Sequence, residues 1–154
     1  MRRKVYLIDM ENISSNVLVR QSIINKKDVV YLLCSRERKI NVDNLESFKE
    51  KKWHIVEVVT KTQANSLDFQ LSSLAGAILA SNDDLDIYIM SKDKGYDSVV
   101  RFFTLTAEGK LIRGSNTIRR YDNFGVLKNT CIENNVKLTG RREVQKKCKV
   151  KQEL

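Results

Sequence analysis

The chain has 154 residues and 42% hydrophobic content, which suffices for one ordinary domain with a single core. Its three cysteines show no CxxC or Cys/His clustering, which argues against a disulfide framework and a structural zinc site. The apolar run before Asp9 is too short for a signal sequence or a membrane span, so we expect a cytoplasmic protein without a membrane partner.

The net charge of +9 is distributed unevenly along the chain. Residues 1–100 contain fifteen Lys and Arg against fourteen Asp and Glu, whereas residues 101–154 contain thirteen against five. This asymmetry favours a polyanionic partner, with nucleic acid first and a membrane surface second. A solubilising surface or a basic tail without a ligand would give the same counts, so charge alone does not identify the partner.

Short apolar runs alternate with helical patterns along the chain. The runs are rich in β-branched residues, as buried strands are, and the helical patterns place apolar residues three and four positions apart. Strands are predicted over residues 4–9, 28–34, 53–59 and 87–90, and a weaker one over 109–114. Helices are predicted over residues 13–24, 41–52, 64–81, 96–106 and 116–135.

This alternation predicts an α/β fold, a single domain of three layers with a central parallel sheet of about five strands. Right-handed crossovers restrict the topology, and the strand order 3-2-1-4-5 places the first and fourth strands side by side. In such sheets ligands bind beyond the carboxyl ends of the strands, where the order reverses. We therefore look for function at the ends of these two strands.

Acidic residues gather at that edge. Asp9 ends the first strand, with Glu11 and Asn12 directly behind it, while Asp93 and Asp97 follow the fourth strand. Taken one at a time, Asp93 is more simply a helix cap and Asp97 a solvated first-turn residue. Carboxylates that converge from separate strands repel one another unless they are protonated or bind a cation.

A further acid, Asp68, lies at the edge of the apolar stripe of the 64–81 helix. An unpaired charge there is costly, although the helix dipole favours an acid in the first turn. Because acids from separate elements meet at one edge, the sequence predicts a divalent-metal site.

Three motifs carry a resemblance to a known family: DMEN at 9–12, SLDFQL at 66–71 and SKDKGYD at 91–97. In this order and spacing they resemble the PIN-like nucleases, in particular their NYN branch, over roughly residues 4–104. The resemblance implies a metal-dependent nuclease, most often an endoribonuclease. From the resemblance, together with the helix and strand patterns beyond residue 104, we expect a nuclease domain over residues 1–136 and a basic, mobile tail over 137–154.

The resemblance implies roles for particular residues as well. It assigns Asp9, Asp68, Asp93 and Asp97 to the catalytic metal cluster. Asn12 would orient a carboxylate or a bound water, Glu11 would be an additional ligand, and Ser91 is the small polar residue before the third motif acid.

The expected cofactor is Mg²⁺ or Mn²⁺, since both prefer oxygen ligands and are held by a few carboxylates together with substrate phosphate. Such an ion lowers the pKa of an attacking water and binds the scissile phosphate. No histidine base is then required, and the single histidine, His54, has a structural interpretation in a predicted strand.

Basic residues near the motifs are candidates for nucleic-acid binding. They are Lys92, Lys94, Arg101, Arg113, Arg119 and Arg120. Lys92 and Lys94 could equally be exposed turn lysines, and for Tyr96 packing on the sheet is favoured over stacking on a base. The expected partner is RNA, with single-stranded RNA among the candidates, and a homodimer remains open. No nucleotide cofactor is expected, because neither GxxxxGK[ST] nor GxGxxG occurs.

The predicted function is a divalent-metal-dependent endonuclease that hydrolyses phosphodiester bonds, in RNA rather than DNA. The alternative is a non-catalytic RNA-binding module that keeps the PIN-like fold. Haloacid dehalogenase phosphatases have a DxD motif after the first strand, where this chain has Asp9-Met10-Glu11, and Glu is a poor substitute for the second Asp. Receiver domains have a phosphoacceptor aspartate at the end of the third strand, and the end of the 53–60 segment contains no such residue.

Overall fold

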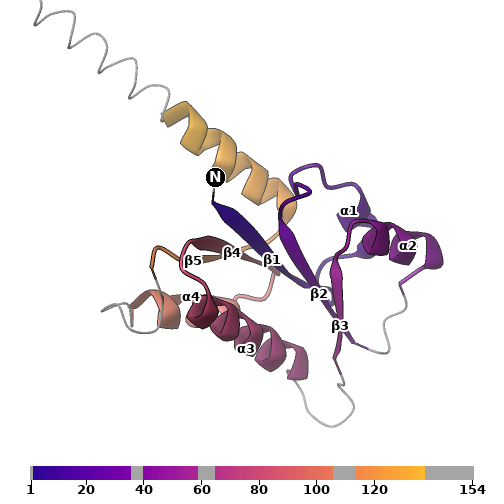
Figure 1. The fold of residues 1–154 in the computed structure, drawn as a ribbon, viewed down its shortest axis with the longest axis horizontal. Coiled ribbons are helices and arrows are strands. Elements are labelled where there is room, and N and C mark those ends of the chain that lie inside the picture. Colours follow the sequence, from indigo (N-terminus) through magenta and orange to yellow (C-terminus); the bar gives the residue numbers. More distant parts are fainter. Residues whose placement is uncertain (1, 36–39, 59–64, 106–113, 138–154) are drawn as a thin grey trace, which may run out of the picture. The chain divides into compact units, whose positions relative to one another are not determined.

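The computed structural model describes residues 2–35, 40–58, 65–105 and 114–137. The chain divides after Asn123 into two compact units. The first, Met1–Asn123, contains every helix and strand labelled in Figure 1, and the second contains a helix over residues 124–137. In the part of the chain that the structure describes, no helix combines the length and apolar character needed to cross a membrane.

A sheet of five parallel strands forms the centre of the first unit (Figure 1). The spatial order is β3-β2-β1-β4-β5, which confirms the predicted α/β fold and its strand order. The strands are β1 (Arg3–Asp9), β2 (Val29–Ser35), β3 (His54–Val58), β4 (Leu85–Met90) and β5 (Thr117–Tyr121). Since Ile8 of β1 pairs with Met90 of β4, the carboxyl ends of these two central strands lie level.

Two helices cover one face of the sheet, α3 (Ser66–Ser81) and α4 (Tyr96–Leu105). In α3 the fully buried Leu71, Ala75 and Leu79 recur every fourth residue, so one stripe of the helix faces the core. They pack with alternate residues of the strands, such as Leu7 and Ile89, because alternate strand residues point to the same face. This packing fixes the N-terminal turn of α3, which carries Asp68, relative to the strands.

The opposite face of the sheet is buried as well. Tyr6 and Ile8 alternate with the residues that face α3, and both are almost inaccessible to solvent. The helices on this side of β1, β2 and β3 are α1 (Ser15–Val19) and α2 (Val42–Glu50), which bury Leu18 and Phe48 (Figure 1). Burial on both faces explains why the strands read as continuous apolar runs.

Three predicted elements differ from the structure. The helix expected over 13–24 is only α1, since Arg20 caps it and the amides of Asn25 and Asp28 form a turn instead. The fifth strand is β5 rather than 109–114, a range that lies outside the described residues except for Gly114 in a turn. The helix expected over 116–135 is the one over 124–137. β5 is an edge strand with two adjacent arginines, which interrupt the alternation of apolar and polar residues by which a strand is recognised in a sequence.

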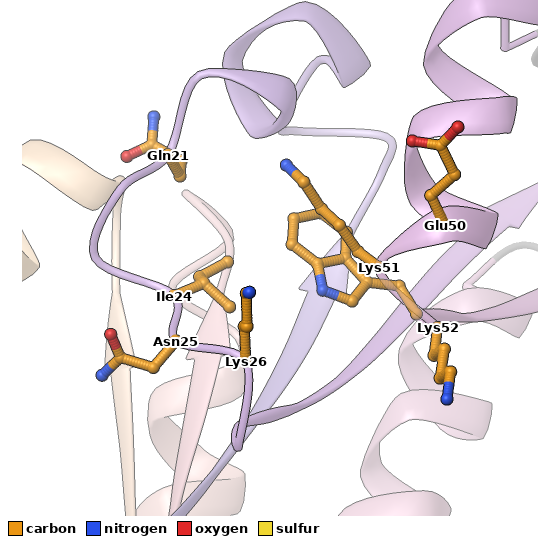
Figure 2. A pocket seen from close by; sticks show the side chains of 8 residues that line it. Gln21, Ile24, Asn25, Lys26, Glu50, Lys51 and Lys52 are labelled. Carbon is orange, nitrogen blue, oxygen red and sulfur yellow. The ribbon is translucent and has the colours of Figure 1, made fainter.

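The two ends of these parallel strands carry different side chains. The carboxyl ends of β1 and β4 carry the predicted acids. At the amino-terminal ends of β2 and β3, a cavity of about 610 Å³ lies between the loop that precedes β2, the end of α2 and Trp53, which leads into β3 (Figure 2). The carboxyl ends of β1 and β4 hold the candidate active site.

Candidate active site

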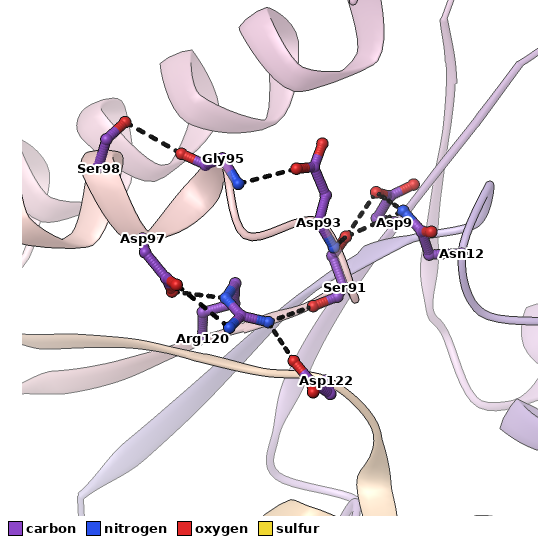
Figure 3. A network of polar contacts seen from close by, with 9 residues as sticks. All are labelled: Asp9, Asn12, Ser91, Asp93, Gly95, Asp97, Ser98, Arg120 and Asp122. Carbon is purple, nitrogen blue, oxygen red and sulfur yellow. Dashed lines mark hydrogen bonds and ion pairs between the residues drawn. The ribbon is translucent and has the colours of Figure 1, made fainter.

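Asp9 is a buried carboxylate at the carboxyl end of β1, only 1% exposed. Its Oδ1 accepts a hydrogen bond from the backbone N–H of Glu11 at 3.0 Å. Its Oδ2 accepts from Asn12 Nδ2 and from Ser91 Oγ, each at 2.8 Å (Figure 3). Three donors therefore offset the cost of burying this charge and fix the orientation of the carboxylate.

Ser91, the residue after β4, joins the ends of the two central strands. Its buried hydroxyl donates to Asp9 and accepts from Asn12 Nδ2 at 3.1 Å and from the backbone N–H of Asp93 at 3.1 Å. A hydroxyl group both donates and accepts, so Ser91 can make all three contacts. Ser91 thus sets the position of Asp93 relative to Asp9.

Asp93 lies in the turn between β4 and α4 and is half-buried. Its Oδ1 accepts from the backbone N–H of Gly95 at 2.8 Å, and its carbonyl accepts from Tyr96 N at 3.3 Å. A Cβ on Gly95 would lie 3.0 Å from Asp93 Oδ1, so a larger residue would crowd the carboxylate. The local capping role considered for Asp93 is therefore present, and it holds the side chain at the mouth of the site.

Asp68 joins this group from the first turn of α3. The buried Tyr96 donates its hydroxyl to Asp68 Oδ1 at 2.8 Å. Burial raises the pKa of the Asp68 carboxyl, the negative charges of Asp93 and Asp9 raise it further, and the Tyr96 hydrogen bond opposes them. The pKa of Tyr96 is also raised, by burial first and then by its bond to Asp68. Asp9, Asp68 and Asp93 therefore share one electrostatic environment.

Asp97 is placed differently from the other three acids. Arg120 Nε donates to its Oδ1 at 2.6 Å and Nη2 to its Oδ2 at 3.3 Å, while the Asp97 side chain stays 56% exposed (Figure 3). These hydrogen bonds lower the pKa of the Asp97 carboxyl. Arg120 also donates to the Ser91 carbonyl at 2.9 Å and to Asp122. The arginine thus ties the end of β5 to the turn that carries the acids.

The predicted nucleic-acid contacts fall into three groups. Lys92, Lys94, Arg101 and Arg119 are exposed. Arg120 is occupied by the two carboxylates and its side chain is 11% exposed, while Arg113 lies outside the described residues. The exposed lysines flank Asp93 and are accessible to a phosphate.

The donors at this edge suit a divalent cation in kind, since all are hard carboxylate or hydroxyl oxygens. Whether these side chains are arranged to hold a metal ion is a separate question from their chemical type. Within the described ranges, no group of three or more His, Cys, Asp or Glu side chains is arranged to hold a metal ion. Asp9 and Asp93 are each engaged in hydrogen bonds, and Glu11 is exposed beside them. Any metal role of the predicted residues therefore remains a prediction.

Sequence reasoning predicted that Asn12 orients a carboxylate, and Asn12 binds Asp9, but it did not predict the partners of Asp68 and Asp97. It interpreted Tyr96 as a packing residue, whereas its hydroxyl binds Asp68. It interpreted Arg120 as a phosphate contact, whereas the side chain binds Asp97 and Asp122. The alternation of β5 puts Arg120 on the same face of the sheet as the core residue Ile118, the face that α4 covers, and this signal could be used only once the strand was placed correctly.

Comparison with known proteins agrees with this architecture. A family model described as PIN domain matches residues 3–112, which is more than half of the chain and includes Asp9, Asp68 and Asp93. No curated protein and no solved structure gives a match. PIN domains are generally nucleases and typically use divalent metal ions. The chain belongs to the PIN domain family.

Proposed function

We propose that this protein is a divalent-metal-dependent endonuclease of the NYN branch that hydrolyses phosphodiester bonds in RNA. One observation carries the proposal: hydrogen bonds bring acids from three separate elements together, since Ser91 joins Asp9 to the backbone of Asp93, and Tyr96, at the start of α4, binds Asp68. Acids that serve only as local caps have no reason to converge in this way. A bound cation would offset their repulsion, since it favours the charged form of each.

The hydrogen bonds around the acids support distinct roles. Asp9, Asp68 and Asp93 would hold Mg²⁺ or Mn²⁺, which supplies a water of lowered pKa and neutralises the scissile phosphate. Asn12 and Ser91 keep the Asp9 carboxylate oriented, and Tyr96 does the same for Asp68. Preorientation matters because a misplaced ligand loses much of its effect on the transition state.

Several exposed cations support a polyanionic substrate. Lys92 and Lys94 flank Asp93 in the same turn, and Arg101 and Arg119 are also exposed. Such residues bind phosphates without reading sequence. RNA is proposed over DNA on the resemblance of the three motifs to NYN-type endoribonucleases.

The test is cleavage of a mixed-sequence single-stranded RNA and of its DNA counterpart with Mg²⁺, Mn²⁺ or EDTA. Asp93→Asn should abolish metal-dependent cleavage and leave the fold intact, because asparagine retains an acceptor for the Gly95 N–H. The matched control is Asp43→Asn, an exposed first-turn acid of α2. Equal cleavage by Asp93→Asn and the parent would contradict the assignment.

The alternative, a non-catalytic RNA-binding module, has two observations in its favour. The described residues hold no group of three or more ligand-type side chains arranged for a metal, and Arg120 occupies Asp97. If RNA binds without cleavage under each metal, while Asp93→Asn binds it equally, this alternative replaces the nuclease.

A further inference from the structure

The cavity at the amino-terminal edge of the sheet has the composition of an anion-binding site. Its eight lining residues are Gln21, Ile24, Asn25, Lys26, Glu50, Lys51, Lys52 and Trp53. The lining therefore holds three lysines and one glutamate, a formal charge of +2. Its volume of about 610 Å³ lies within the range of roughly 300–1,000 Å³ that ligand pockets occupy.

The lysines come from two separate segments. Lys51 and Lys52 follow the last turn of α2, where cations are favoured by the helix dipole without any ligand. That explanation does not extend to Lys26, which comes from the loop before β2 and points into the same space (Figure 2). The end of α2 and the loop before β2 thus both contribute positive charge to this cavity.

Trp53 gives the cavity a rigid aromatic wall. Its ring stacks on Phe48 with centroids 5.3 Å apart, and only 9% of the residue is exposed. Lys51 lies across the indole, its Nζ 4.9 Å from the ring centroid (Figure 2). Ile24 contributes a second apolar surface. Because Phe48 and Lys51 cover the indole, a ligand in the cavity can reach only the exposed edge of Trp53. Lysine ammonium groups beside this edge and the Ile24 side chain suit a phosphate joined to a planar base.

We propose that this cavity binds one nucleotide of an RNA strand, with its phosphate at Lys26 and Lys51 and its base against Ile24 and the exposed edge of Trp53. The choice of RNA as the ligand rests on the proposed function. The cavity would act as a second contact for a substrate whose scissile bond lies at the acids.

The separation of the two sites sets a substrate length. They lie at opposite ends of parallel strands, and the seven residues of β1 span on the order of 20 Å. A stacked strand rises about 3.4 Å per nucleotide, so at least roughly six nucleotides are needed to bridge the sites, because the RNA must pass around the packed sheet. A 12-nucleotide RNA should therefore reach both sites, and a trinucleotide only one.

Trp53 is the only tryptophan, so intrinsic fluorescence of the full chain reports on this cavity. We would titrate a single-stranded 12-mer RNA in EDTA, which prevents metal-dependent cleavage, and follow tryptophan emission together with the anisotropy of a labelled RNA. The expected result is a saturable change in Trp53 emission that follows RNA binding. RNA binding with silent Trp53 emission would overturn the inference, as would an emission change given by a poly-glutamate peptide but not by RNA.

Two double variants of equal charge separate a specific site from general attraction. Lys26→Gln with Lys51→Gln removes two cavity lysines, whereas Lys27→Gln with Lys49→Gln removes two exposed neighbours that do not line it. The first pair should weaken 12-mer binding roughly tenfold at 0.1 M salt and reduce the salt slope by about 0.7, because one phosphate contact is lost. Equal weakening by both pairs would contradict the inference.

These readouts are independent of catalysis. A chain that binds RNA through the cavity but never cleaves would disprove the nuclease proposal and leave the cavity site intact. A chain whose cleavage depends on Asp93 while Trp53 emission stays silent would disprove only the cavity site.

Discussion

Replacing Asp68 with asparagine should stabilise the folded protein and abolish cleavage at the same time. Burial and the charges of Asp9 and Asp93 raise the pKa of Asp68, so its charged form weakens the fold at neutral pH. Asparagine removes this charge and still accepts the Tyr96 hydrogen bond through its side-chain oxygen. Few substitutions at a buried hydrogen bond would be expected to increase stability.

The expected gain is small and measurable. Two unit charges about 4 Å apart in water-like surroundings repel by about 1 kcal/mol, and Asp68 is partly exposed, so we expect a gain of about that size. For a chain of this length, about 1 kcal/mol raises the Tm by roughly 2–4 °C. Cleavage should fall more than about 100-fold, because even outer partners of metal ligands cost 10–100-fold.

The pH dependence has a definite sign. Because the folded-state pKa of Asp68 is raised, the gain from Asp68→Asn should be full above that pKa. It should fade as the pH falls through that value and vanish below the pKa of the unfolded chain. Asp97 is the matched opposite case, since Arg120 lowers its pKa. Asp97→Asn should lose about 0.5 kcal/mol at neutral pH, a contribution that the parent itself loses as the pH falls through the lowered pKa.

Thermal and urea unfolding of both variants, measured from pH 3 to 8 without metal, test this reasoning together with a cleavage assay. The two variants should shift stability in opposite directions. If Asp68→Asn destabilises the fold at pH 7 and cleaves RNA normally, then Asp68 is an ordinary satisfied acid and the three carboxylates do not act as a group.

Two further predictions concern the connection between the strands and the basic tail. Ser91→Ala should cost about 1–3 kcal/mol in urea unfolding, because it removes a donor from buried Asp9 and the acceptor for the Asp93 N–H; a loss below 0.5 kcal/mol would show that water replaces the hydroxyl. Removing residues 138–154, which hold six Lys and Arg against two Glu, should weaken RNA binding and flatten its salt dependence without ending cleavage; an unchanged slope would leave the tail without a role in binding.

Sequence patterns predicted most of the fold because they report on local structure and burial. Continuous apolar runs identified four of the strands, and α3 and α4 were placed to within about two residues. The fifth strand was misplaced because β5 has adjacent arginines, and an exposed Arg119 beside a buried Ile118 resembles a loop. The short α1 was extended too far because apolar residues beyond Arg20 continue its spacing without remaining helical.

The sequence alone determined which acids stand at the ends of β1 and β4 and at the start of α3. Strand order and right-handed crossovers then bring those ends together. Only the tertiary structure decided the distant partner of each acid: Asp9 with Ser91, Asp68 with Tyr96, and Asp97 with Arg120. The physical reason is that burial and element type follow local periodicity, whereas these three hydrogen bonds join side chains 23–82 positions apart in the sequence.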